Sequence, residues 1–339
     1  MNKLSSSQIF RKTLKYVLLR MMIPLVSAIV SVVAMKVITG IVAGEEGNTM
    51  GWISILIWLV ITGAVYFLLN FMIGYRFHAG HMAIITDAVS VSMLPDDMGA
   101  LAKESTEYRF PSGNEYLSYR NAVKGSIQQL QYELNTFAEN KMRVPVLGQL
   151  IRFCQFIIGH ELSFTYDLVL CYTFWRDGKT LYTSAADGVA VYWDSWKRMM
   201  NNIWFLVIEM AIGMAVGFLF VFVLAAASLS PASGIGAGAL AGIVTGYFVC
   251  KAAKVIIDTN LTIKTLDAYF EEGQYADYNS EEYEEMCRYS KKYSKLYHKA
   301  LDEAFAPATE DSYGYDYNNY NEDDYDYSAD FGNWGAEWQ

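Results

Sequence analysis

The residues of this chain best placed to do chemistry are charged side chains inside long apolar runs. Arg20 and Glu209 each lie a few residues inside such a run. A charge inside a membrane is costly, so it usually marks a transport path or a pair that locks helices together. We therefore predict that Glu209 and Arg20 form a transport or bundle-locking charge pair. The alternative is that both side chains reach the membrane surface, with Arg20 extending its stem toward the lipid headgroups.

No pattern of an enzyme or a metal centre stands out elsewhere. The chain lacks a glycine-rich phosphate loop, a nucleophile elbow and an HExxH sequence. The four cysteines have no CxxC spacing, which indicates isolated thiols in a reducing compartment. His78 and His81 share a helical face without a carboxylate at ligand spacing, so we interpret the histidines as surface or interfacial residues. We expect no catalytic residue, no metal and no cofactor.

Four apolar runs must position these charges. They cover Tyr16–Ala43, Gly51–Ile73, Ile203–Ser228 and Gly234–Ile257. Each exceeds the roughly 18–20 residues that cross a bilayer as a helix. The sequence therefore predicts an all-α, multi-pass membrane protein with four transmembrane helices in two hairpins, plus amphipathic cytoplasmic or interfacial helices.

The loops predict the orientation. Lys and Arg gather before the first run, after the second and around the ends of the later pair, whereas the two short links within the hairpins carry no basic residue. This bias predicts a protein of the cell (inner) membrane with both termini on the cytoplasmic side. Aromatic and basic residues just before the third run are typical interface anchors. These anchors are Trp193, Trp196, Lys197 and Arg198.

We divide the chain into five parts on this basis. They are a transmembrane hairpin (1–75), a cytoplasmic or interfacial helical region (76–201), a second hairpin (202–258), cytoplasmic helices (259–306) and a disordered acidic tail (307–339). The tail holds nine acidic residues and no Lys or Arg, which accounts for nearly all of the net charge of −10. Without a basic surface, the chain is not expected to bind nucleic acid.

Several segments outside the runs have helical periodicity. Gly80–Met93 predicts an amphipathic helix, and Gly113–Asn140 carries a heptad-like apolar seam that could pack inside the chain or form an oligomeric coiled coil. Residues 146–175 are apolar but short, so they could dip into the membrane or, as we favour, lie flat on its surface. Thr183 or Ser184 could cap the helix that follows. The Tyr-rich tail could bind a cytoplasmic partner or merely aid solubility.

Small residues mark a packing face in the second hairpin. Glycines repeat every four residues in the fourth run, and the third run offers two more. Such faces let membrane helices approach closely, within one chain or between copies. The helix-packing candidates are Gly213, Gly217, Gly238, Gly242 and Gly246.

One stretch resembles a known family. Tyr182–Trp196 (YTSAADGVAVYWDSW) enters a span, a second span follows, and Ile257-Asp258-Thr259 then leads to an acidic segment. This order is similar to the C-terminal part of the choline transporter-like proteins. The chain also resembles uncharacterised prokaryotic multi-pass membrane proteins with a Gly-His after an early span and a Ser-Ala-Ala-Asp-Gly stretch. The family-like positions are Gly80, His81, Ser184, Ala185, Asp187, Gly188, Asp258 and Thr259.

Two functions fit these features. The resemblance implies a small-solute transporter or pore, which would need a homo-oligomer because four helices enclose little space. The alternative is a membrane-shaping or scaffold protein that assembles through its cytoplasmic helices and recruits a partner through its tail. We favour transport on the resemblance.

Overall fold

The computed structural model describes residues 4–42, 52–141, 164–176, 178–195, 217–219, 222–223, 227, 235–276, 278 and 280–305. The chain divides into two units, Met1–Ala304 and Phe305–Gln339. The described residues belong almost entirely to the first unit, and the tail predicted over 307–339 lies outside them. The described part of the chain is helical and contains no strand. The prediction of an all-α protein is confirmed to this extent.

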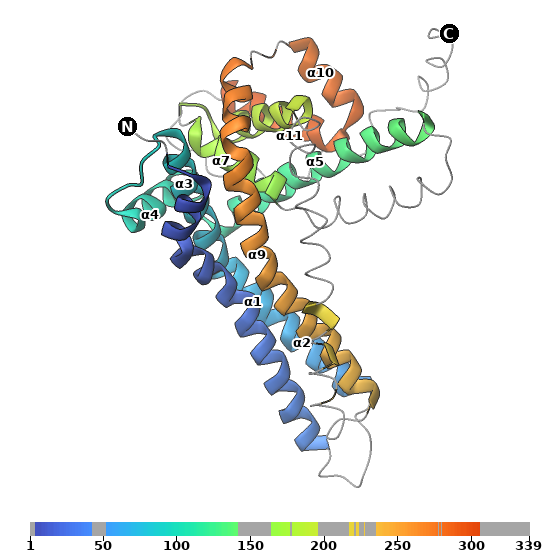
Figure 1. Ribbon diagram of the computed structural model, residues 1–339. Coiled ribbons are helices and arrows are strands. Elements are labelled where there is room, and N and C mark those ends of the chain that lie inside the picture. The colour runs from blue at the N-terminus through green and yellow to red at the C-terminus, as the bar shows by residue number, and fades with distance from the viewer. Residues whose placement is uncertain are drawn as a thin grey trace. The chain divides into compact units, whose positions relative to one another are not determined.

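The helices of the first unit form a long bundle and, at one end of it, a layer of shorter helices (Figure 1). In chain order they are α1 (Ser6–Val42), α2 (Trp52–Leu69), a π-helical turn η1 (Asn70–Gly74), α3 (Tyr75–Ser90), α4 (Met98–Arg109), α5 (Gly113–Lys141), α7 (Phe164–Trp175), a helix over 181–195, α9 (Ile235–Tyr275), α10 (Ser280–Tyr289) and α11 (Lys291–Phe305).

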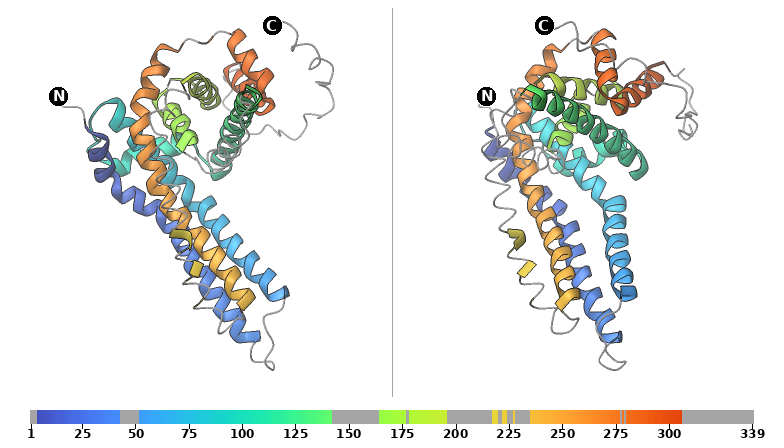
Figure 2. Two further views of the ribbon diagram at one scale, coloured as in Figure 1. Left: turned by 45° about the vertical axis from the view of Figure 1, so that its right-hand side comes forward. Right: turned by 90° about the vertical axis from the view of Figure 1, so that its right-hand side faces the viewer.

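The bundle consists of α1, α2 and the first half of α9, which lie side by side in both views of Figure 2. Among the described residues, three helices are long and apolar enough to cross a membrane: Ser6–Ile41, Ile53–Ser90 and Gly238–Tyr275. Large apolar side chains cover their outer surface, as Ile29 at 63% exposure and Val60 at 69% illustrate. Such a surface is expected to face lipid. Most of the predicted third span, 203–228, lies outside the described residues.

The second span does not end before the amphipathic helix that we predicted over Gly80–Met93. Instead, α2, η1 and α3 form one continuous helix that runs from the bundle into the layer. The interpretation of 80–93 as an amphipathic helix is wrong for most of its length, because Ile84 is as fully buried as Ile85. A helix that is buried on all sides belongs in a core rather than on a surface. It ends at Ser90, before Ser92 at a φ of 59°.

The seam of α5 packs inside the chain. Its apolar residues Tyr116, Val123, Ile127 and Leu130 are at most 2% exposed and belong to one apolar cluster with α7, α10 and α11. The intramolecular alternative is therefore confirmed for this part of the seam. The side chains at 134 and 137 lie outside the described residues.

The interpretation of 164–175 as a surface or membrane-dipping segment is wrong. This stretch forms α7, and its side chains from Phe164 to Thr173 are all buried by neighbouring helices of the layer. Length and hydropathy alone do not distinguish such a core helix from an interfacial one. The other half of the predicted hairpin, 146–163, lies outside the described residues.

The helix over 181–195 begins one turn earlier than the predicted caps allow. Thr180 rather than Thr183 or Ser184 is the capping residue, since the Thr183 amide donates to Thr180 Oγ1 at 3.4 Å. The pair α10–α11 covers this helix with apolar side chains. Tyr293 and Leu296 are at most 1% exposed, and the Tyr293 hydroxyl donates to the Ala186 carbonyl at 3.2 Å.

Candidate functional site

A buried group of charged and polar side chains lies where the bundle meets the layer, and we call it the Asp167 cluster. Asp167 is the single acid of α7 and is 1% exposed. The members come from five helices that are distant in sequence. They are Arg20 (α1), His78 and His81 (α3), Tyr116 and Arg120 (α5), Tyr166 and Asp167 (α7), and Thr259 (α9).

Two basic side chains of the bundle helices hold the Asp167 carboxylate. His78 Nε2 lies 2.9 Å from Asp167 Oδ1, and Arg20 Nη2 lies 3.6 Å from Oδ2. Burial by itself raises the pKa of the Asp167 carboxyl, but His78 and Arg20 outweigh it and keep this pKa below its ordinary value. Asp167 is therefore ionised at neutral pH and ties α7 to α1 and α3.

The hydrogen bonds define how His78 is protonated. An ionised carboxylate only accepts, so the proton on His78 Nε2 points to Asp167. The other ring nitrogen, Nδ1, contacts the Tyr116 hydroxyl. A neutral His78 avoids a second buried cation beside Arg20, and its Nδ1 then accepts from Tyr116. Tyr116, His78 and Asp167 thus form a continuous chain of hydrogen bonds from α5 to α7.

Arg20 also orients His81. Its Nη1 lies 3.3 Å from His81 Nδ1 and 3.3 Å from Thr259 Oγ1. A guanidinium only donates, so Nδ1 accepts and the His81 proton is on Nε2. That N–H is fully buried and has no acceptor among the described residues. The ring itself stacks on Tyr16, with 6.0 Å between centroids.

Aromatic rings and a second guanidinium complete the cluster. Tyr166 stacks on His78 at 5.9 Å between centroids, and Arg120 lies 5.9 Å from the Tyr166 ring. Burial raises the pKa of Tyr116 and of Tyr166, so both phenols stay neutral at physiological pH. The site can therefore hold or pass a proton along hydrogen bonds, with Asp167 as its only described carboxylate.

Three of the predicted site residues meet in this cluster. Arg20 was singled out as a bundle charge, whereas His81 and Thr259 belong to the family-like positions. The proposed partner of Arg20, Glu209, lies outside the described residues. The interpretation of His78 and His81 as surface histidines is wrong for His81, which is 0% exposed, and His78 is mostly buried too. Sequence reasoning missed Asp167, although an isolated acid in a twelve-residue apolar helix was a usable signal.

The other family-like positions pack helices. A Cβ added at Gly80 would lie 2.9 Å from Ala102 Cβ on α4. Gly188 lies against Val169 and Tyr172 of α7, and its carbonyl accepts from Tyr269. Ser184 and Ala185 are fully buried, with the Ser184 hydroxyl donating to the Arg176 carbonyl at 3.3 Å, and Asp258 pairs with Lys254 at 4.0 Å.

Asp187 forms a second, smaller polar contact. Its Oδ2 lies 2.5 Å from Lys179 Nζ, and its Oδ1 accepts from the Tyr283 hydroxyl at 2.6 Å. The family-like position Asp187 therefore fixes α10 to the helix over 181–195. Trp193 of that helix stacks on Tyr289 of α10 at 5.9 Å, so it has a protein neighbour. The other interface anchors, Trp196, Lys197 and Arg198, lie outside the described residues.

The predicted glycine face is buried in α9. Gly238, Gly242 and Gly246 are all buried, and a Cβ at Gly246 would lie 3.0 Å from the Phe218 ring. This contact joins α9 to a described fragment of the third run. Gly217 has open space around it, and Gly213 lies outside the described residues.

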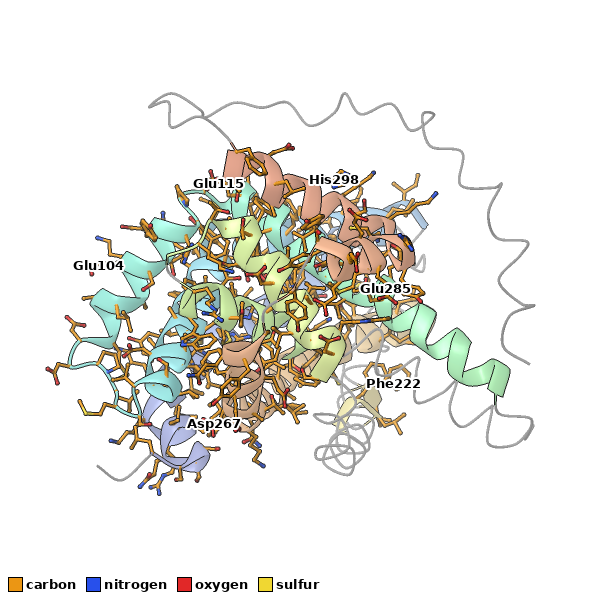
Figure 3. The ribbon with its side chains drawn as sticks, turned by 90° about the horizontal axis from the view of Figure 1, so that it is seen from above. Glu104, Glu115, Phe222, Asp267, Glu285 and His298 are labelled. Atoms are coloured by element: carbon orange, nitrogen blue, oxygen red, sulfur yellow. The ribbon has the colours of Figure 1, made fainter. Side chains whose placement is uncertain are left out.

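Seen from above the layer (Figure 3), Glu104 of α4 lies at its outer edge, and Glu104 and Glu285 of α10 are both exposed. Among the described residues, no three His, Cys, Asp or Glu side chains gather in a way that could hold a metal ion.

Comparison of the chain with protein-family models, curated proteins and solved structures finds no match. The resemblance to choline transporter-like proteins therefore stays a prediction.

Proposed function

We propose that this chain is a small-solute transporter or pore and that the Asp167 cluster closes the inner end of its path. The observation that carries the proposal is the burial of the Asp167 carboxylate between Arg20 and His78, at the end of helices able to cross a membrane. Buried ion pairs add little stability compared with apolar packing, so such a group calls for another reason. Ion and proton pathways are the usual reason in membrane proteins.

The interior of the bundle supports the same reading. Its outer surface is apolar, whereas Ser27 and Ser31 of α1 and Thr62 of α2 are at most 2% exposed. A path for a polar solute needs hydroxyl-bearing side chains on the inner faces of its helices. These residues lie on the two helices that also supply Arg20 and, beyond η1, His78.

The proposal includes the topology that the loops predict. Four transmembrane helices in two hairpins would place both termini and the helical layer in the cytoplasm, at the inner membrane of the cell. The Asp167 cluster would then lie on the cytoplasmic side. A homo-oligomer would enclose the path, since four helices leave little space between them, and the acidic tail would be free to bind a cytoplasmic partner.

The scaffold alternative loses one of its supports. One of its expected assembly surfaces was the seam of α5, and the described seam residues are covered by helices of the same chain. Assembly through another surface or through the tail stays a prediction. Transport is therefore the function that the geometry of the described residues favours.

Flux into proteoliposomes tests the proposal. Purified protein would be reconstituted at defined orientation, and uptake of radiolabelled choline, of K⁺ or Na⁺, and of protons by an internal pH dye would be measured. We expect uptake of at least one probe above protein-free liposomes. We further expect Asp167→Asn to change it at least tenfold, because the substitution removes the charge that holds Arg20 and His78.

Asp96→Asn is the matched control, since Asp96 is an exposed acid outside the cluster. Its flux should equal that of the unmodified protein. Absence of flux for all probes in the unmodified protein would refute transport of these solutes. Equal flux in Asp167→Asn and Asp96→Asn would be compatible with transport but would refute the role of the Asp167 cluster in closing the path.

A further inference from the structure

Three hydroxyl groups inside the bundle differ from their neighbours. Buried Ser and Thr side chains in membrane helices usually donate to the carbonyl one turn earlier, as Thr13 and Ser27 do at 3.0 and 2.9 Å. Ser31, Thr62 and Thr245 do not. Their hydroxyl oxygens are inaccessible to solvent and have no hydrogen-bond partner among the described residues.

These residues come from three helices at one level of the bundle. A small apolar cluster joins α1, α2 and α9 near the end of the bundle farther from the layer. Its members are Met35, Ile55, Trp58 and Ala241. Ser31 lies one turn from Met35, Thr62 one turn from Trp58, and Thr245 one turn from Ala241. In each helix the hydroxyl-bearing residue is the one nearer the layer (Figure 1).

Two contacts fix how α1, α2 and α9 are aligned with one another at this level. The Trp58 indole donates to the Ser31 carbonyl at 2.8 Å, which ties α2 to α1 at the hydroxyl level. One turn nearer the layer, the Tyr66 and Phe248 rings pack at 5.1 Å between centroids and tie α2 to α9. Thr62 and Thr245 therefore lie between the level of the apolar cluster and the level of the Tyr66–Phe248 ring contact.

Unpartnered hydroxyls at this depth need a ligand. In hydrocarbon, no solvent is present to satisfy them, and a buried polar group without a hydrogen bond is strongly disfavoured. A buried water typically makes about three hydrogen bonds to such groups. We propose that Ser31, Thr62 and Thr245 bind a shared water molecule inside the bundle.

Water fits the chemistry of the three groups better than a cation. Each hydroxyl can donate and accept, which matches a molecule that does both. None carries a charge that would compensate a dehydrated Na⁺ or K⁺ in the membrane. The site lies along the bundle interior that leads toward the Asp167 cluster, but the inference depends on the hydroxyls alone and does not require transport.

A double-mutant cycle in lipid nanodiscs tests the shared ligand. Thr62→Val and Thr245→Val each remove a hydroxyl at nearly constant volume. We expect each to lower the Tm by about 1–2 °C, the shift expected for one lost interaction in a chain of this length. The double variant should fall no further than the worse single variant, because the water is already lost. Additive losses, or a rise in Tm, would overturn the proposal.

Thr39→Val provides the matched control. The Thr39 hydroxyl is buried in α1 but donates to the carbonyl of Met35 in its own helix. Its effect should add to that of Thr62→Val. Thr62→Ser keeps the hydroxyl and should retain the Tm of the unmodified protein. A loss as large as in Thr62→Val would show that methyl packing matters instead, and would count against a bound water.

The salt in the buffer separates water from a cation. The Tm should be the same in NaCl, KCl and N-methylglucamine chloride at equal ionic strength. A Tm that rises with Na⁺ or K⁺, and no longer does so in Thr62→Val, would overturn the assignment of water and replace it with a cation.

Discussion

The substitution Asp167→Asn probes how strongly the buried ion pair holds the layer on the bundle. Asparagine has the shape of aspartate, and its amide oxygen can still accept from His78 Nε2. The change therefore removes charge rather than volume. Arg20, whose side chain is only 9% exposed, loses the counter-charge of Asp167. Removing one partner of a buried pair costs about 3–5 kcal/mol.

We expect about 3 kcal/mol for Asp167→Asn, at the lower end of the range for buried pairs, because the bond to His78 survives. Reversible unfolding in mixed micelles of SDS and a mild detergent would measure this loss. Asp96→Asn should change the unfolding free energy by less than about 0.5 kcal/mol, as exposed substitutions usually do. A loss below about 1 kcal/mol for Asp167→Asn would refute the view that the pair is buried and coupled.

The pH dependence gives an independent check on the same residue. The pKa of Asp167 is lower in the folded state than in the unfolded chain, where it is about 3.9. Its stabilisation is therefore complete above that value and is lost as the pH falls through the folded pKa. The unmodified protein should lose stability more steeply than Asp167→Asn below about pH 4. Parallel curves would contradict the ionised state of the buried carboxylate.

Other contacts make shorter predictions. Gly80→Ala should destabilise the fold by roughly 1–3 kcal/mol through its clash with Ala102, and adding Ala102→Gly should recover part of this loss in the same unfolding assay. Tyr283→Phe should cost about 1.5 kcal/mol, because its hydroxyl donates to the Asp187 side chain, and should speed proteolysis between α9 and α10. Cys171 is fully buried, and burial raises its pKa far above the ordinary value, so maleimide should label it only after unfolding.

Periodicity predicted the long helices well. The expected segment 113–140 corresponds to α5, and the fourth run corresponds to the first part of α9, because both carry regular apolar or small-residue spacing over many turns. The same reasoning failed for α7. A helix buried on all sides has no polar face, so its sequence is similar to that of a membrane-associated segment.

The site was predictable only in part. Arg20 drew attention as a charge in an apolar run, and His81 and Thr259 did so through short motifs. Their meeting depends on the packing of α1, α3 and α9, which no local pattern encodes. Asp167 lay in a segment that was judged by its hydropathy, so its isolation among apolar neighbours was overlooked. A lone acid in a buried helix needs a partner, and that reasoning would have linked it to Arg20 or His78.

The continuous helix α2–η1–α3 and the helix α9 each run from the bundle into the layer. The helix α9 passes from the bundle into the layer without a break, whereas α2 does so through the π-helical turn at Asn70–Gly74. A π turn holds one more residue than an α turn, so it changes which face of the following helix meets a neighbour. In this chain the following helix is α3, in which His78 contacts Asp167 and His81 contacts Arg20. Asp167 therefore contacts, through His78, the same continuous helix that carries Thr62 in the bundle.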